Sequence, residues 1–108
     1  MKIQCHCGAL IVDQTDDLSH KARLLPDQVW NAVSDALDDE VVNAVADGRL
    51  GREAACHRWR EIVGRSARLM WQCRACGRLY VDDQQHQLQC YVPASEDTSR
   101  QVLREGAR

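Results

Sequence analysis

The 108-residue sequence contains no phenylalanine and two prolines, and its aromatic residues are three tryptophans and two tyrosines. A chain of this length buries only about two-thirds of the surface that it exposes when unfolded, so its apolar core is small. Small domains of this kind often need an additional cross-link. We therefore expect one small domain that is stabilised by more than its core, and its six cysteines are the candidates for the cross-link.

The sequence also lacks an excess of charge of either sign, because 14 Lys and Arg residues stand against 16 Asp and Glu residues. Proteins that bind nucleic acid through a general electrostatic surface are usually basic as a whole, so this balance disfavours that class. No apolar run approaches the ~18–20 residues that a membrane-spanning helix needs. Cys5, His6 and Cys7 interrupt the apolar residues near the N-terminus, where a signal peptide would need them. We expect a cytoplasmic protein that does not bind membranes.

Four of the six cysteines fall in two close pairs, Cys5-His6-Cys7-Gly8 and Cys73-Arg74-Ala75-Cys76-Gly77. The glycine that follows each pair can adopt a positive φ, which lets the backbone curl beneath a metal ion. Four thiolates at about 2.3 Å complete a tetrahedron around Zn²⁺ and leave no open position, as in structural zinc sites. The spacing therefore predicts one structural zinc ion, with the ligands Cys5, Cys7, Cys73 and Cys76.

Other interpretations of the cysteines stay open at this point. The pairs could be redox-active or buried thiols, although a Cys-x-x-Cys redox motif usually lies in a βαβ context. Iron also suits four thiolates, and His6 could replace one cysteine of the shorter first pair. Cys56 and Cys90 have no close partner in sequence, so we expect both to be small buried apolar side chains. His57 follows Cys56 directly, and adjacent residues of a helix do not face each other.

Hydrophobic periodicity predicts a mixed α+β fold. Residues 2–4 and 9–12 read as a β-hairpin with the first cysteine pair at its tip, followed by a polar loop over 13–20. Apolar residues at spacings of three and four predict a helix of about 20 residues from 27 to near Gly48, and a second helix over 53–66. Strands are expected over 68–72, 78–82 and 87–92, with Leu88, Cys90 and Val92 on the buried face of the last.

The two predicted helices carry charge of opposite sign on their outer faces. The first bears Asp35, Asp38, Asp39 and Glu40, and the second bears Arg52, Arg58, Arg60 and Arg65. An acidic docking patch and a nucleic-acid surface are possible functions of these faces. We favour pairing between the two helices, or solvation, because the chain as a whole is slightly acidic.

The two cysteine pairs, each between short strands, resemble the two knuckles of a zinc ribbon. Residues 8–72 separate the inner cysteines, which implies a helical insertion at about 25–66 that packs on the ribbon. The segments 13–16, 21–22, 27–30 and 73–81 resemble small uncharacterised bacterial zinc-ribbon proteins over roughly residues 1–93. The resemblance implies a small antiparallel sheet of two β-hairpins joined by a four-cysteine zinc site. Residues 1–93 would form one domain, with a polar, flexible tail over 94–108.

A second resemblance is to the glutathione-dependent formaldehyde-activating enzymes. It rests on Cys5-His6-Cys7-Gly8-Ala9-Leu10 together with Cys73, Cys76 and Gly77. That family implies a structural zinc at two such pairs and a second, catalytic zinc on a central cysteine cluster. The middle of this chain offers only Cys56 and His57, so the resemblance does not extend to the catalytic site.

Three functions follow from these patterns. We expect first a non-enzymatic protein-interaction or adaptor module, with a protein as partner and with Trp30, Trp59, Trp71 and Tyr91 as candidate anchors. The alternative is a nucleic-acid-binding ribbon that contacts phosphates through Arg74 and Arg78. An enzyme, such as a metalloenzyme like the formaldehyde-activating family, is the third possibility. It would need an open metal position or a reactive thiol, for which Cys56 is the one central candidate.

Overall fold

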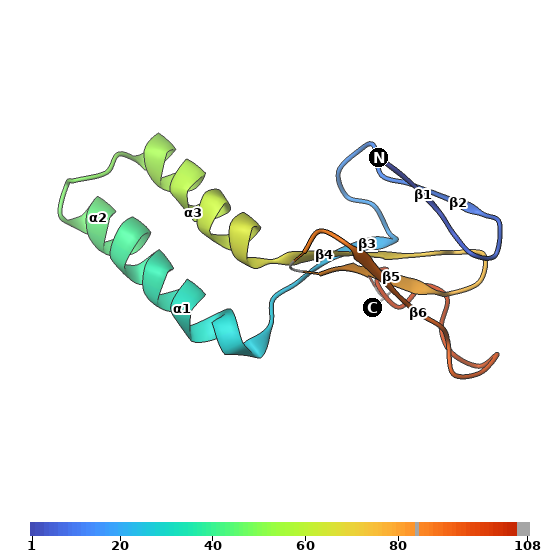
Figure 1. Cartoon of the computed structure of the whole chain (residues 1–108). Coiled ribbons are helices and arrows are strands. Elements are labelled where there is room, and N and C mark those ends of the chain that lie inside the picture. The colour runs from blue at the N-terminus through green and yellow to red at the C-terminus, as the bar shows by residue number, and fades with distance from the viewer. Residues whose placement is uncertain (84, 106–108) are drawn as a thin grey trace. The chain divides into compact units, whose positions relative to one another are not determined.

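The computed structural model describes residues 1–83 and 85–105. The chain divides into two compact units (Figure 1). We call the first the sheet unit, which combines Met1–Leu24 with the chain from Arg68 onward, and the second the helical unit, which is Leu25–Ala67. The protein is therefore α+β, as predicted, and each unit is described separately below.

The N-terminal hairpin of the sheet unit pairs β1 (Lys2–Gln4) with β2 (Leu10–Val12) in antiparallel register. Ile3 lies opposite Ile11, and both side chains are buried, whereas Lys2 and Gln4 are exposed. This alternation is what a two-stranded ribbon with one buried face requires. The predicted hairpin is confirmed.

Four antiparallel strands form the larger sheet, in the order β3 (Lys21–Leu24), β4 (Arg68–Gln72), β5 (Leu79–Asp82) and β6 (Leu88–Tyr91). The sequence analysis predicted β4, β5 and β6 but no strand over Lys21–Leu24. Lys21-Ala22-Arg23-Leu24 has little intrinsic preference for a strand. Its pairing with β4, which lies beyond the whole helical unit, determines its conformation. The predicted second hairpin is thus part of a four-stranded sheet.

The edge strand β6 is less buried than its alternating sequence predicted. Cys90 lies opposite Tyr80 and packs against the core, but Leu88 and the following Val92 are 38% and 67% exposed. The prediction that Leu88 and Val92 are buried is wrong. The core beneath the sheet is small, and on β6 it reaches only the residue paired with Tyr80.

The core of the sheet unit joins the hairpin to the larger sheet. Its buried residues come from both elements, namely Ile3, Cys5, Ile11, Trp71, Cys73 and Tyr80. Trp71 is 1% exposed, and its indole Nε1 donates a hydrogen bond of 2.9 Å to the Asp13 carboxylate. Lys21 forms a 2.8 Å ion pair with the same carboxylate. The one polar group of this large buried side chain is therefore satisfied, as burial demands.

Part of the polar C-terminal segment is hydrogen-bonded to the sheet unit. The buried Gln72 amide donates to the Ser99 carbonyl at 3.0 Å and accepts from the Val102 N–H at 2.8 Å. The Arg100 guanidinium donates to the Ala75 carbonyl at 3.0 Å. The domain boundary predicted after residue 93 stays a prediction.

The helical unit is an antiparallel pair of helices. Its first helix runs through α1 (Asp27–Leu37), the π-helical turn η1 (Asp38–Val42) and α2 (Asn43–Ala46), and α3 (Arg52–Ser66) returns beside it (Figure 1). Gly48 ends the first helix with φ +74°, a conformation that glycine adopts without strain. Both predicted helices are confirmed, and the π-helical turn is an unpredicted feature.

One predicted charge pair joins the two helices. Arg58 of α3 lies 3.2 Å from Glu40 of η1. Both side chains are about two-fifths exposed, and such pairs contribute little to stability. The pair therefore contributes little to the stability of the helical unit.

Within the described residues, every helix is too short or too polar to span a lipid bilayer.

Asp13 provides a test of the sheet unit. Hydrogen bonds from Lys21 and Trp71 hold the pKa of the Asp13 carboxyl below its ordinary value. The associated stability is fully present above the pKa of unfolded aspartate and is lost as the pH falls through the lower folded pKa. We expect Asp13→Asn to lower the free energy of unfolding by about 1–3 kcal/mol at neutral pH, measured by denaturant titration. The same change at exposed Asp16 is the control and should have little effect.

A carboxyl-carbon NMR titration measures the shift directly. We expect the Asp13 carboxyl to titrate below the ordinary aspartate pKa of about 3.9. An ordinary pKa together with an unchanged stability of Asp13→Asn would show that the carboxylate does not support Trp71.

Candidate metal centre

The first cysteine loop connects β1 to β2 in a tight turn. The Cys5 N–H donates to the Ala9 carbonyl at 2.9 Å, and the Gly8 N–H donates back to the Cys5 carbonyl at 3.0 Å. Gly8 has φ +96°, so the turn uses a backbone conformation that favours glycine. This geometry brings the side chains of Cys5 and Cys7 to the same side of the loop.

The second loop, between β4 and β5, repeats the arrangement with one more residue. The Cys73 N–H donates to the Arg78 carbonyl at 2.9 Å, and the Gly77 N–H donates to the Cys73 carbonyl at 2.7 Å. Gly77 has φ +85°. The closing bond spans four residues here and three in the first loop. The Cys-x-Cys pair therefore compensates for its missing residue with a tighter turn, and the positive φ predicted for both glycines is confirmed.

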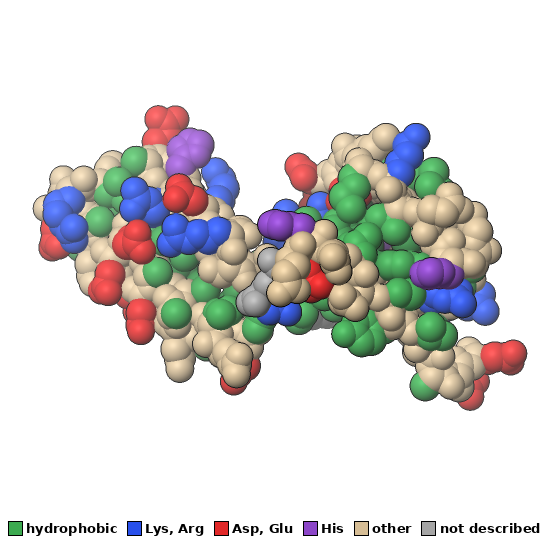
Figure 2. Space-filling view, viewed as in Figure 1, with side chains coloured by type: hydrophobic (Ala, Val, Ile, Leu, Met, Phe, Trp, Pro, Cys, Tyr) green, Lys and Arg blue, Asp and Glu red, His purple; other side chains and the backbone are tan. Residues whose placement is uncertain are grey.

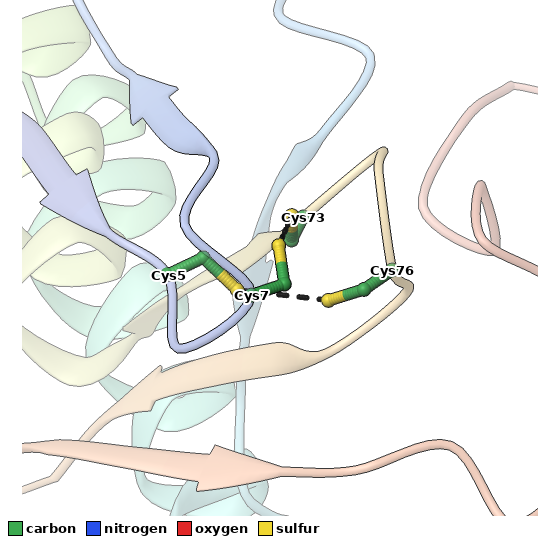
Figure 3. Close-up of side chains that lie close together, drawn as sticks. All are labelled: Cys5, Cys7, Cys73 and Cys76. Atoms are coloured by element: carbon green, nitrogen blue, oxygen red, sulfur yellow. Dashed lines mark hydrogen bonds between the residues drawn. The ribbon is translucent and has the colours of Figure 1, made fainter.

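The four sulfurs converge from these two loops (Figure 3). Cys5 Sγ lies 3.6 Å from Cys76 Sγ, and Cys7 Sγ lies 3.7 Å from Cys73 Sγ. All four lie within 4.8 Å of one another. Ligands at about 2.3 Å from one ion in a tetrahedron are about 3.8 Å apart. The cluster therefore has the size that a tetrahedral thiolate site for a metal ion requires.

Both of these sulfur pairs join one loop to the other, and all six cysteines are free thiols. The distances are far longer than the ~2.05 Å of a disulfide. Cys5 and Cys73 are buried, Cys76 is half-buried and Cys7 is exposed. The cluster thus lies at the edge of the core, and the side chain of Cys7 faces solvent.

Hydrogen-bond donors surround the sulfurs. The Tyr80 hydroxyl lies 3.3 Å from Cys5 Sγ, and the Arg78 guanidinium lies 3.2 Å from Cys76 Sγ. Burial opposes ionisation of the Cys5 thiol, but the Cys7 N–H and the Tyr80 hydroxyl outweigh it and lower the pKa of Cys5 to about 6. The pKa of Cys76 is also lowered, because the backbone and side chain of Arg78 outweigh its burial. These donors favour the thiolates that a metal ion binds.

Cys73 is the exception. Burial raises the pKa of its thiol to about 12, more than the hydrogen bonds from the Cys76 and Ala75 backbone lower it. A buried anion beside other thiolates needs a neighbouring cation. A bound divalent ion deprotonates its coordinating thiols outright. A cation among the four sulfurs would therefore stabilise the Cys73 thiolate.

His6 takes no part in the four-cysteine cluster of the described residues. Its N–H donates to the Tyr80 hydroxyl at 3.1 Å, and its ring stacks on the Tyr80 ring with 6.3 Å between centroids. The structure therefore favours four cysteines over a set that includes His6. Sequence analysis missed the role of Tyr80, whose signal is only its position on the buried face of β5.

The remaining candidate residues lie elsewhere. Cys56 and His57 are exposed on α3, so the prediction that Cys56 is buried is wrong. Cys90 is half-buried and packs against the core. Of the candidate aromatic anchors, Trp71 is a core residue, whereas Trp30, Trp59 and Tyr91 are 55%, 49% and 59% exposed.

Comparison with known proteins gives one match. A family model described as "Domain of unknown function (DUF8617)" matches residues 1–95, a range that includes both cysteine loops. No curated protein and no solved structure matches the chain.

Tyr80→Phe tests the hydrogen bond to Cys5. The change keeps the ring and its stacking partner but removes the hydroxyl that contacts the sulfur. Loss of such an outer contact typically weakens metal binding by about 10–100-fold. We expect a loss of this size in competition with a chromophoric zinc chelator. Tyr91→Phe, on the exposed edge strand, is the matched control, and equal affinities of the two variants would show that the hydroxyl does not act on the sulfur.

Proposed function

Because the chain belongs to the DUF8617 family, whose function is not established, we propose its function from the cysteine cluster. The protein is a non-enzymatic protein-interaction module that is stabilised by one structural Zn²⁺. The ligands are Cys5, Cys7, Cys73 and Cys76, and the ion fixes the N-terminal hairpin to the four-stranded sheet. The observation that carries the proposal is the convergence of four sulfurs from two loops at tetrahedral spacing.

The donor set supports a structural role. Four thiolates fill a tetrahedral ion and leave no position for water or substrate. Structural zinc binding contributes folding free energy on the order of 10 kcal/mol in small peptide sites. That contribution compensates for the few buried residues of the sheet unit.

The enzymatic alternative finds little support. A second, catalytic zinc would need another cluster of ligands, and among the described residues the four cysteines are the one group of His, Cys, Asp or Glu side chains placed to hold an ion. Cys56 and His57 are exposed neighbours on one helix. The resemblance to the formaldehyde-activating enzymes is therefore limited to the structural site.

Partner binding is assigned to the edge strand β6. Its outer N–H and C=O groups have no neighbouring strand in the described sheet, and a partner strand can pair with such an edge. Exposed Leu88, Tyr91 and Val92 supply the apolar side chains beside it. The nucleic-acid alternative loses one of its two arginines, because Arg78 contacts Cys76 Sγ.

Native mass spectrometry with metal analysis tests the metal. We expect one zinc ion per chain with all cysteines reduced. Cys73→Ser should lose zinc and unfold or aggregate. The variant keeps three thiolates, and the neutral serine hydroxyl that replaces the fourth is a poor zinc ligand. Cys90→Ala, a half-buried cysteine outside the cluster, is the control and should keep zinc at a cost of at most a few kcal/mol. Full zinc content and native melting in Cys73→Ser would refute the site.

Cobalt substitution tests the closed coordination shell. We expect Co²⁺ to give the intense visible bands of tetrahedral thiolate coordination, and these bands should not change when imidazole or cyanide is added. An open site would accept the added ligand and shift its spectrum. Such a shift would favour the enzymatic alternative.

A further inference from the structure

The helical unit has a small core of its own. Its buried side chains are Val33, Ala44, Ala55 and Ile62, two of which are alanines. Two helices packed side by side cover only one stripe of each other, and helices of this length depend on tertiary packing for stability. The unit also exposes large apolar side chains, including Val45 at 44% and Trp59 at 49%.

Part of this exposed apolar surface forms a groove between the two helices. Val41 and Val45 line it from the η1–α2 side, and Ala55, Cys56 and Trp59 line it from α3. Arg52 and Arg60 complete the lining, and the volume is about 330 Å³. On α3, positions 52, 56 and 59 are spaced by four and three residues, so they share one face of the helix. The groove is thus an apolar strip with guanidinium groups on one helix.

The charges of the two helices are of opposite sign. Residues 27–46, which form α1, η1 and α2, contain five carboxylates and no Lys or Arg, and α3 contains four arginines and two glutamates. Glu40–Arg58 is the one ion pair between them among the described residues. Asp38, Asp39, Arg52 and Arg60 form no ion pair within the described part of the chain. Figure 2 shows acidic and basic side chains interspersed with apolar ones over the helices.

We propose that a second copy of this chain covers the groove, so that two helical units form a four-helix dimer. A two-fold interface places the same surface of each copy against the other. With the axis parallel to the helices, the acidic first helix of each copy opposes the arginine-bearing α3 of the other. Opposite charges then face each other in both of the equivalent helix contacts. A two-fold axis perpendicular to the helices would instead place the first helix against the first helix and α3 against α3, so that like charges would meet. A purely acidic or purely basic partner would complement only one helix.

The π-helical turn contributes to this surface. Such turns are frequent at functional sites, and η1 supplies both Val41 of the groove and the carboxylates Asp38 and Asp39. The inference concerns the helical unit alone and does not rest on the zinc site.

Sedimentation equilibrium on the purified 108-residue chain tests the dimer. We expect a dimer at micromolar concentrations. Trp59→Glu should weaken it by at least about 30-fold, since a central interface aromatic contributes about 2 kcal/mol or more. Tyr91→Glu changes an equally exposed aromatic of the sheet unit and should leave the dimer intact. The helicity and the melting temperature of each variant, compared with those of the wild type, establish that it is folded.

A wild-type chain that stays monomeric at about 100 µM overturns the proposal and leaves the groove to a different partner. A dimer that Trp59→Glu and Tyr91→Glu affect equally also overturns it.

A charge exchange tests the arrangement of the helices. One variant carries Arg52→Glu and Arg60→Glu, and the other carries Asp38→Lys and Asp39→Lys. Each variant alone brings like charges together at the substituted positions in both halves of the interface, so its dimer should be weaker than that of the wild type. An equimolar mixture restores opposite charges at these positions and should form a heterodimer. Failure of the mixture to associate, or unchanged dimerisation of either variant alone, contradicts the opposition of the first helix to α3. Because neither variant touches the cysteines, this result is independent of the zinc proposal.

Discussion

The convergence of four sulfurs from two distant loops is the constraint on which the sheet unit depends. The hairpin and the larger sheet form separate hydrogen-bonded ladders. Their contact is made by Ile3 and Ile11 against Trp71 and Tyr80, and by the cysteine loops. Cys5 and Cys73 are themselves core residues. The core and the candidate metal site are therefore one structure, and neither can change without the other.

Because the cysteines lie in or beside the core, burial opposes ionisation of their thiols. Neighbouring hydrogen-bond donors outweigh this effect at some of the cysteines and not at others. Donors at Cys5 and Cys76 favour their thiolates, whereas burial keeps Cys73 protonated in the absence of a cation. A metal ion that binds to thiols displaces their protons, so its affinity depends on pH. Of the four thiols, Cys73 is the one whose thiolate burial disfavours most, so a cation would have the largest effect on its ionisation.

Local signals in the sequence predicted local structure well. The cysteine spacing and the glycines identified both loops, and helical periodicity identified both helices. The strand β3 was missed because its conformation depends on β4, which lies beyond the helical unit. Cys56 was wrongly predicted to be buried, because the burial of lone cysteines is only a statistical tendency. The groove that Cys56 lines could not be predicted, because it depends on how the two helices pack. The contact of Tyr80 with Cys5 could not be predicted from the sequence, because the two residues are 75 positions apart and only the fold brings them together.

The position of the helical unit in the chain explains how one protein can contain both the four-cysteine cluster and the helical groove. Leu24 of β3 pairs with Arg68 of β4, and the helical unit lies between these two residues. The chain therefore leaves and re-enters the sheet at adjacent points, so the insertion interrupts no ladder. The proposed zinc site therefore belongs to one unit and the proposed dimer surface to the other. If both proposals hold, each dimer carries two β6 edges, and a partner with two matching strands gains avidity without any new contact.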